Sequence, residues 1–284
     1  MTAAISVHGV RKSYGSTEAL AGIDFEVGRG EVFGLLGPNG AGKTTTVEIL
    51  EGYRKRDAGT VDVLGFDPGS APTGLRAKIG VVLQQSELPY VLTAREILRM
   101  FGGYYERRRD VDEVLELVGL TDKANARAKT LSGGQRRRLD LGVALIGDPD
   151  VVFLDEPTTG FDPAARRSAW EMVRSLRSLG KTILLPTHYL DEAQQLADRV
   201  AVLVDGKIVR LGPPSELIGA SAQTTVRFRR GGETVVIETG EPTRVLNELT
   251  AEALARGEEL EALEVLRPTL EDVYLELVDG EAEA

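Results

Sequence analysis

One stretch of the sequence combines glycines, a lysine and a hydroxyl residue at a spacing suited to phosphate chemistry. Residues 37–44 fit the pattern G-x-x-x-x-G-K-[ST]. Glycines let successive backbone N–H groups turn toward an anion, and a helix that begins at the loop adds unpaired N–H groups and a favourable dipole. Lys43 would reach the β- and γ-phosphates of a nucleotide, and the Thr44 hydroxyl would bind Mg²⁺. We therefore predict nucleotide contacts for Gly37, Pro38, Asn39, Gly40, Ala41, Gly42, Lys43, Thr44 and Thr45.

Two adjacent carboxylates follow a second apolar run. Val151–Leu154 predicts a buried strand, and Asp155 and Glu156 come directly after it. Such a strand would carry both carboxylates to the edge of a sheet beside the phosphate loop. One carboxylate is needed to hold Mg²⁺, a role that we assign to Asp155. A second is needed to polarise the attacking water, and we assign this general-base role to Glu156.

A second glycine-rich string lies between these two motifs. Residues 131–135 read Leu-Ser-Gly-Gly-Gln and precede a probable helix. A serine and two glycines at a helix start form another anion-binding nest, although an ordinary N-cap followed by glycine would look the same. One ATP held by the first loop does not need a second nest from the same chain. In this string the sequence resembles the ABC ATPases, whose signature motif reads LSGGQ.

The resemblance implies how the second nest is used. Ser132, Gly133 and Gly134, with Gln135 beside them, would contact the γ-phosphate of an ATP that the other subunit holds. Two copies of the chain would then pair head to tail as a homodimer with two composite ATP sites. The resemblance covers residues from about 5 to 212 and thus includes both phosphate motifs and the carboxylate pair.

Other family motifs occur in the expected order. The resemblance assigns an adenine-stacking role to Tyr14 and a place in the loop across the dimer interface to Asp162. It assigns to Gln84, at the end of the predicted strand Ile79–Leu83, a contact with Mg²⁺ and the attacking water, with Gln85 as the adjacent competitor. His188 matches the switch histidine near the γ-phosphate.

Two residues depart from the family pattern. Phe161 stands where the family most often has leucine, a change that a hydrophobic contact should tolerate. Pro186 lies two residues before His188. Proline lacks a backbone donor and restricts the residue before it, so the sequence leaves open whether Pro186 shifts the strand end that positions His188.

An α/β sheet must position these residues. Strands are expected at Glu31–Leu36, Ile79–Leu83, Val151–Leu154, Thr182–Leu185 and Val200–Val204, with a helix at Lys43–Leu50. Asp205-Gly206 predicts a two-residue hairpin turn. The resulting fold class is the P-loop NTPase fold of the ABC ATPases, with a helical subdomain inserted at about residues 93–147, where Val114, Leu117 and Val118 have helical spacing.

The composition shifts after Pro213-Pro214. We expect an ABC ATPase domain over residues 1–220 and a small C-terminal α+β appendage over residues 221–284 that ends in an acidic tail. The appendage should contain strands at Thr224–Arg229 and Glu233–Glu238, a helix that begins at Pro242 and a last helix capped by Thr269.

Composition narrows the function classes. The 284 residues include no cysteine, which excludes disulfides and thiolate metal sites, and the net charge of −10 disfavours general nucleic-acid binding. The basic runs Arg107–Arg109 and Arg136–Arg138 are interpreted as solvated helix faces, with membrane-surface contact as the alternative. No window suits a signal peptide or a membrane-spanning helix. We expect a cytoplasmic protein that is peripheral on the inner face of the cell membrane.

Three functions could use this ATPase chemistry: a transporter subunit, a soluble ABC ATPase acting on ribosomes or DNA, and a nucleotide kinase. A kinase has no use for LSGGQ. Translation-type relatives generally carry two cassettes, and DNA-maintenance relatives carry long coiled coils; this chain has one cassette and no sustained heptads. The ending Pro268–Leu277 resembles the drug-resistance type of exporter ATPases, whose partners are separately encoded ABC-2-type permeases. We therefore predict an exporter subunit for a lipophilic or drug-like substrate.

The permease should contact the segment after Gln84. Residues 86–92 are apolar for a surface loop, and in the family this region receives coupling helices from the membrane subunit. The alternative places Leu88, Val91 and Leu92 in the protein core.

Overall fold

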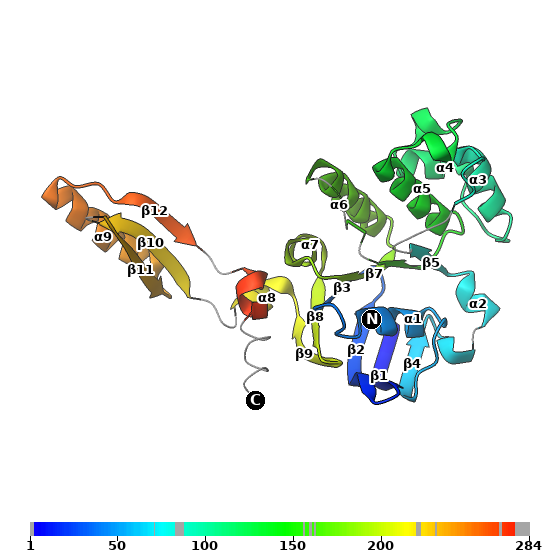
Figure 1. The fold of residues 1–284 in the computed structure, drawn as a ribbon, viewed down its shortest axis with the longest axis horizontal. Helices are drawn as coiled ribbons and strands as arrows, with labels where there is room; N and C mark the ends of the chain where they lie inside the picture. Colours follow the sequence, from blue (N-terminus) through cyan, green and yellow to red (C-terminus); the bar gives the residue numbers. More distant parts are fainter. Residues whose placement is uncertain are drawn as a thin grey trace. The chain divides into compact units, whose positions relative to one another are not determined.

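A six-stranded sheet forms the centre of the first of two compact units, Met1–Leu211 and Gly212–Ala284. The computed structural model describes residues 3–70, 72–82, 88–155, 157–158, 161, 163–219, 223–230, 232–266 and 269–275 (Figure 1). The strand order is β5-β6-β7-β3-β8-β9, and the pairings from β5 to β8 are parallel. The strands are β3 (Val32–Leu36), β5 (Ile79–Val82), β6 (Val151–Leu154), β7 (Thr182–Thr187), β8 (Arg199–Val204) and β9 (Lys207–Gly212).

The predicted α/β fold is confirmed, and all five predicted strands are present. Every residue of β3, β6 and β7 is buried, as expected of parallel strands that are covered on both faces. The predicted turn Asp205-Gly206 joins β8 to β9, and both residues have positive φ angles of 44° and 75°. These angles are those of the type I′ turn that Asp-Gly favours.

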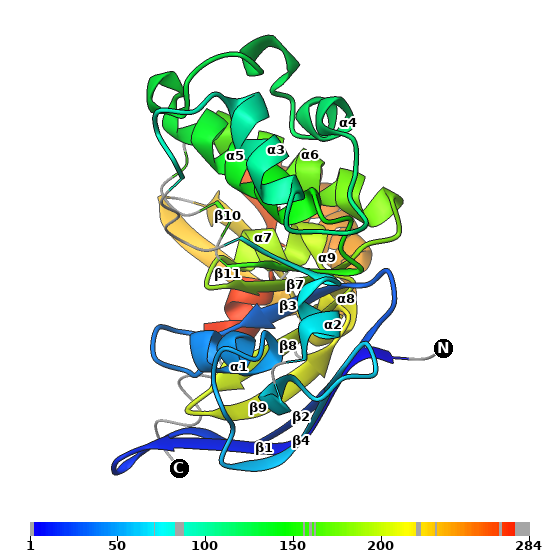
Figure 2. The same ribbon diagram turned by 90° about the vertical axis from the view of Figure 1, so that its right-hand side faces the viewer.

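A three-stranded antiparallel sheet, which the sequence analysis did not predict, packs on one side of the central sheet. Its order is β2-β1-β4, with β1 at Ala3–Tyr14, β2 at Thr17–Gly28 and β4 at Ala58–Val63 (Figure 2). Its apolar side chains share one core with α1 (Lys43–Leu50) and with Phe33 and Phe153 of the central sheet. The register between β1 and β2 shifts repeatedly, so the alternation that reveals a strand is broken.

Helices between β5 and β6 form the predicted insertion. They are α3 (Ala94–Gly102), α4 (Val111–Leu117) and α5 (Gly133–Leu145), with short 3₁₀ turns at Thr121–Lys123 and Ala128–Thr130. Thr93 caps α3 in a capping box with Glu96. Buried side chains of the three helices, Ile97, Leu98, Val114 and Leu139 among them, belong to the core on the other side of the central sheet.

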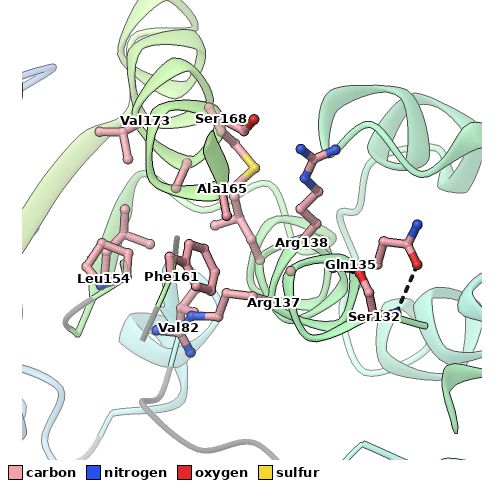
Figure 3. Close-up of a pocket in the computed structure, with 15 residues that line it drawn as sticks. Val82, Ser132, Gln135, Arg137, Arg138, Leu154, Phe161, Ala165, Ser168 and Val173 are labelled. Carbon is pink, nitrogen blue, oxygen red and sulfur yellow. Dashed lines mark hydrogen bonds between the residues drawn. The ribbon is translucent and has the colours of Figure 1, made fainter. Parts of the chain in front are cut away.

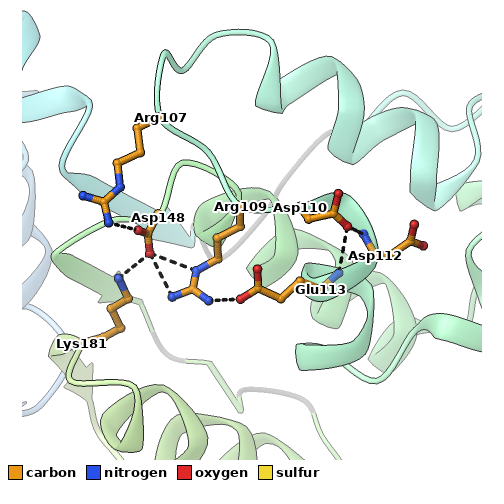
Figure 4. Close-up of polar contacts among 7 residues, drawn as sticks. All are labelled: Arg107, Arg109, Asp110, Asp112, Glu113, Asp148 and Lys181. Atoms are coloured by element: carbon orange, nitrogen blue, oxygen red, sulfur yellow. Dashed lines mark hydrogen bonds and ion pairs between the residues drawn. The ribbon is translucent and has the colours of Figure 1, made fainter.

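An ion-pair cluster around Asp148 attaches this insertion to the sheet (Figure 4). Arg107 and Arg109 lie after α3, and Lys181 directly precedes β7. Asp148 accepts from Arg107 at 2.7 Å, from Arg109 at 3.0 Å and from Lys181 at 2.8 Å. The expectation of a helix face at 107–109 is therefore wrong: the run lies in a loop, and Arg109 has only 15% of its side chain exposed.

The remaining helices of the first unit follow the sheet strands. They are the 3₁₀ turn Pro68–Ser70, α2 (Thr73–Arg76), α6 (Pro163–Ser178) and α7 (Leu190–Leu196). Trp170 and Val173 of α6 contribute to the same core as the inserted helices.

The second unit contains a three-stranded antiparallel sheet of order β11-β10-β12. Its elements are α8 (Pro214–Gly219), β10 (Thr224–Arg230), β11 (Glu233–Thr239), α9 (Pro242–Arg256) and β12 (Glu261–Leu266). Pro242 opens α9 as predicted, and Asp272 N donates to Thr269 Oγ1 at 3.4 Å at the start of the helical residues 270–275. The sequence analysis missed β12. The boundary between the units lies at Leu211/Gly212, whereas we expected 220/221.

Across the described part of both units, no helix combines the length and the apolar character that a membrane span requires.

Candidate active site

Three adjacent strands bring candidate residues to one edge of the sheet. β6, β7 and β3 are neighbours in that order and run parallel. Asp155 directly follows β6, His188 follows β7 and Gly37 follows β3. Leu36 is in register with Thr187, so Gly37 and His188 leave the sheet side by side. In open parallel sheets the loops at the carboxyl edge form the ligand site.

The fourth strand of this edge leads to the candidate glutamine. Val82, the last residue of β5, is in register with Leu154, the residue before Asp155. Gln84 and its competitor Gln85 lie outside the described residues, as do Glu156 and Asp162. Their roles remain predictions from the sequence.

The phosphate loop needs glycine for reasons internal to the fold. A Cβ atom on Gly37 would lie 2.3 Å from the Leu203 carbonyl oxygen, and one on Gly42 would lie 2.5 Å from the Ala19 carbonyl oxygen. Gly42 also has a φ angle of 107°, which L-residues rarely adopt. The surrounding backbone therefore fixes the shape of the loop.

The first turn of α1 is open to an anion. Its N-cap, Gly42, offers no side-chain hydrogen bond, and no acidic side chain lies in that turn. Lys43 Nζ donates to the carbonyl oxygens of Gly37 at 2.6 Å and Pro38 at 3.0 Å, which holds the ammonium group over the loop. Asn39, Gly40 and Thr44 are exposed, whereas Ala41 is buried and Thr45 is half-buried. N–H groups, an ammonium and a hydroxyl fit the phosphates of a nucleotide with bound Mg²⁺.

Asp155 is half-buried and lies near other charged side chains. The Asp155 N–H donates to the Val82 carbonyl oxygen at 3.3 Å. The Arg137 side chain of α5 donates to the Asp155 backbone carbonyl oxygen at 3.0 Å. Burial, and then the negative charges of Asp155 and Glu48, raise the pKa of Glu51 to about 8. Glu51 is the C-cap of α1, so the charge of Asp155 acts on the end of α1 opposite to the phosphate loop. A carboxylate here can serve as an oxygen ligand for Mg²⁺.

The signature string forms the start of α5. Ser132 is the N-cap in a capping box: Ser132 N donates to Gln135 Oε1 at 3.0 Å, and Gln135 N donates to Ser132 Oγ at 3.3 Å. Within the part of the chain that the structure describes, a Cβ atom on Gly133 or Gly134 would have no neighbour within 4 Å, and neither glycine has a positive φ angle. The chain itself therefore gives no reason for glycine at these two positions.

A cavity of about 370 Å³ separates α5 from α6 beside this string (Figure 3). Ser132, Gln135 and Arg138 line it from α5, and Phe161 and Met172 line it from the other side. The signature end of α5 thus meets α6 across a cavity and not through a packed interface. Phe161, the departure from leucine, makes an apolar wall here, as expected of a hydrophobic contact.

Tyr14 lies at the end of β1 with 40% of its surface exposed. The Arg54 guanidinium lies 5.1 Å from the centre of its ring, and Lys12 Nζ lies 5.6 Å from it. Arg54 also donates to Glu48 of α1 at 2.5 Å. These contacts connect the ring to the helix of the phosphate loop and leave part of it open to a stacking partner.

His188 is half-buried, and its ring centre lies 4.1 Å from that of Tyr189. The strand end before it is not disturbed by Pro186. β7 continues through Pro186 and stays in register with β3 as far as Thr187. Its pairing with β6 ends earlier, at Leu184, so Pro186 lies where β7 has one partner strand, a position that tolerates proline.

The sequence analysis overlooked two charged residues of this region. Arg137 was interpreted as part of a solvated helix face, but of the run 136–138 only Arg136 is exposed. Burial lowers the pKa of the Arg137 guanidinium, which bonds to the chain at Asp155. Glu192, four residues after His188, is fully buried. Its polar sequence context carried no signal of burial.

Comparisons with known proteins agree with this geometry. The family model described as ABC transporter matches residues 20–159. A Nod factor export ATP-binding protein I of Rhizobium sp. (strain N33) is 41% identical, over 99% of this chain and 98% of that protein. A daunorubicin resistance ATP-binding protein of Streptomyces coeruleorubidus is 38% identical, over 96% of this chain and 95% of that protein.

Solved structures give the same result for the fold. A Clostridium perfringens protein described as part of an ABC transporter complex has a TM-score of 0.71 and 27% identity, covering 77% of this chain and 92% of that one. A dimeric ATP-binding cassette in a post-hydrolysis state with ADP and Pi has a TM-score of 0.65 and 27% identity, covering 74% of this chain and 98% of that one.

Proposed function

The chain belongs to the ATP-binding and ATP-hydrolysing subunits of ABC transporters, and we propose that it drives a separately encoded ABC-2-type permease that exports a lipophilic or drug-like substrate. The relatives that span nearly the whole chain are named for Nod factor export and for daunorubicin resistance. One name states export, and the other states resistance to daunorubicin. The alternative of a soluble ATPase that acts on ribosomes or DNA is not favoured.

The observation that carries the proposal for the dimer is the open space around Gly133 and Gly134. Glycine lowers helix stability, and here nothing in the chain requires it. A partner surface that approaches the backbone closely would require it. An ATP phosphate held by the phosphate loop of a second copy is such a surface, and the solved cassette that resembles this chain is itself dimeric. Each ATP would then lie between Lys43 of one copy and Ser132 of the other.

The chain's own residues divide the chemistry of hydrolysis. The N–H groups of the phosphate loop and Lys43 hold the phosphates, and Tyr14 stacks on adenine. Mg²⁺, when bound by Thr44 and Asp155 with Gln84 nearby, neutralises phosphate charge. Glu156 accepts the proton of the attacking water, while His188 contacts the γ-phosphate at the same edge of the sheet.

ATP binding would close the dimer, and loss of the γ-phosphate contact would let it open again. This cycle moves the permease through the surface beside α3. There, Tyr90 is 45% exposed and Val91 is 72% exposed, whereas Leu88 is buried in the core and Leu92 packs against it. The core alternative therefore holds for Leu88 and Leu92 but not for Val91, and Tyr90 and Val91 are exposed for the proposed contact. The chain would lie on the inner face of the cell membrane through this contact.

Two variants test the site. Glu156→Gln should bind ATP, form a stable dimer with Mg-ATP in size-exclusion chromatography and lose turnover. Lys43→Ala should lose nucleotide affinity and stay monomeric under the same conditions. Full turnover by Glu156→Gln would refute the general-base assignment.

The permease is tested by a pull-down from native membranes with the Glu156→Gln chain and Mg-ATP. Recovery of a multi-span membrane protein supports the proposal and identifies that protein. Recovery of ribosomal or DNA-associated proteins alone contradicts it, while the ATPase chemistry would stand.

A further inference from the structure

Glu192 is a buried carboxylate that the proposed chemistry does not use. It lies in α7, four residues after His188, and its exposed fraction is 0%. Thr158, itself fully buried, donates from Oγ1 to Glu192 Oε1 at 2.9 Å. A glutamate is rarely buried completely unless partners compensate its charge. The partners of Glu192 therefore indicate what it is for.

These partners come from three elements that meet at the site. Thr158 lies two residues after Glu156, and Thr187 is the last residue of β7, directly before His188. Trp170 belongs to α6. Burial raises the pKa of Glu192, and the polar groups of Thr187, Thr158 and Trp170 near its carboxyl oppose that rise. The carboxylate thus lies among α6, the segment after Glu156 and the residue before His188.

One of these contacts is incomplete. Among the described residues, Trp170 Nε1 and Glu192 Oε2 are both buried without a partner of good hydrogen-bond geometry. Trp170 nevertheless lies close enough to lower the pKa of the carboxyl. A buried indole donor and a buried carboxylate oxygen that both lack a partner are each costly in the protein interior. A hydrogen bond between the two would remove that cost.

A second contact joins the same helices nearer the surface. Arg166 of α6 donates to Asp191 Oδ2 of α7 at 3.1 Å, and its guanidinium lies 4.9 Å from the centre of the Tyr189 ring. Tyr189 in turn stands beside His188 and donates from its N–H to Thr187 Oγ1 at 3.0 Å. These contacts connect α6 to the residues on both sides of His188.

We propose that Glu192 is a positioning residue that couples α6 to the His188 loop, so that closure of the dimer sets His188 against the γ-phosphate. α6 begins at Pro163, directly after Asp162 in the loop proposed to cross the dimer interface. That loop therefore moves α6, and Trp170 passes the movement to Glu192. The inference rests on the proposed roles of His188 and Asp162.

The test is ATP turnover by the full chain in its permease complex. Glu192→Gln keeps the size of the side chain but sets an amide donor against the Trp170 and Thr187 donors. We expect kcat to fall about tenfold or more while the ATP dissociation constant changes less than about twofold. Glu171→Gln, on an exposed residue of α6 next to Trp170, is the matched control and should behave as wild type.

A double variant separates positioning from structural support. If Glu192 acts through His188, adding Glu192→Gln to His188→Ala should cause no further loss of kcat, because the effects of coupled residues are not additive. Full additivity, or a lower melting temperature with kcat unchanged, overturns the inference.

A second pair of variants keeps the test decisive if Glu192→Gln does not fold. Thr158→Val removes the hydroxyl that bonds to Glu192 and should lower kcat, and Thr158→Ser should restore it. Equal turnover by the two overturns the inference. If Lys43→Ala or Glu156→Gln turns over ATP normally, the proposed site fails instead, so the two failures are distinguishable.

Discussion

The phosphate loop and the signature string are both glycine-rich starts of helices, yet their surroundings differ. In the phosphate loop, Gly37 and Gly42 face backbone atoms so closely that a Cβ atom would lie within 2.5 Å of a carbonyl oxygen. In the signature string, Gly133 and Gly134 face open space. The first loop is shaped by its own chain, whereas the second has no internal reason for its composition.

The N-terminal caps of α1 and α5, the helices that follow these two strings, also differ. α1 has no side-chain cap, so the N–H groups of its first turn are open to a ligand. α5 has a complete capping box between Ser132 and Gln135. The comparison teaches that a helix start is built either to hold a ligand within the chain or to be stable alone and meet a partner. Four predictions test it, in order of their expected effect on the free energy of unfolding.

Gly42→Ala should have the largest effect. The new Cβ atom would lie 2.5 Å from the Ala19 carbonyl oxygen, at a φ angle of 107°. We expect a loss of about 4 kcal/mol or more in the free energy of unfolding, since both backbone strain and a clash are introduced. Urea denaturation without nucleotide measures it. A loss below about 1 kcal/mol would show that the surrounding backbone does not fix the conformation of the phosphate loop.

The pH dependence of stability tests how closed the phosphate-loop region is. Glu51 has an ordinary pKa of 4.5 and a pKa of about 8 in the folded chain. The folded state therefore holds the proton more tightly, and stability falls as the pH rises from 4.5 to 8. We expect a loss on the order of 3 kcal/mol across this window, since one pKa unit is about 1.4 kcal/mol and Glu51 is not wholly buried.

Glu51→Gln is the control for this pH dependence. In the absence of Mg²⁺ its stability should vary less over the same window, because the titrating group is gone. Thermal unfolding of both proteins at several pH values between 4.5 and 8 gives the comparison. Parallel curves would mean that Glu51 titrates normally and that the Asp155 side of the loop is open to solvent.

Ser132→Ala should lower the free energy of unfolding by about 1 kcal/mol, because it removes one half of the capping box. Nucleotide binding by a single chain should not change, since Ser132 serves the ATP of the other copy in the proposed dimer. Denaturation and titration with ATP measure the two effects. Weaker ATP binding by the monomeric chain would place the signature string in the same site as Lys43.

The phosphate loop could be predicted because all the residues of its motif lie within eight consecutive positions, 37–44. The buried strands were predictable because their apolar runs are continuous. β1 and β2 were missed, since their register shifts break the alternation of side chains. β12 was missed because all six of its residues are exposed and only the pairing with β10 makes it a strand.

The site was predictable only as far as its local motifs. The strand order brings Gly37, Asp155 and His188 to the same edge of the sheet. This order cannot be predicted from a local sequence motif. Arg137 contacts Asp155, 18 positions away, and Glu192 contacts Thr158, 34 positions away. Such long-range contacts form only when the chain folds. Both side chains are charged, and charged side chains are usually exposed to solvent, so nothing in the sequence indicated their burial.

Gly134→Ala should have the smallest effect on folding and the opposite sign. Alanine fits the open space at this position and favours the helix, so the free energy of unfolding should rise by about 0.5 kcal/mol. ATP-driven dimer formation in the Glu156→Gln background should nevertheless be lost, because the added methyl group occupies the surface that the partner's phosphate approaches. Denaturation and size-exclusion chromatography of the same preparation measure both. A more stable chain that cannot dimerise would show that glycine is there for the partner, whereas normal dimer formation would remove that reason.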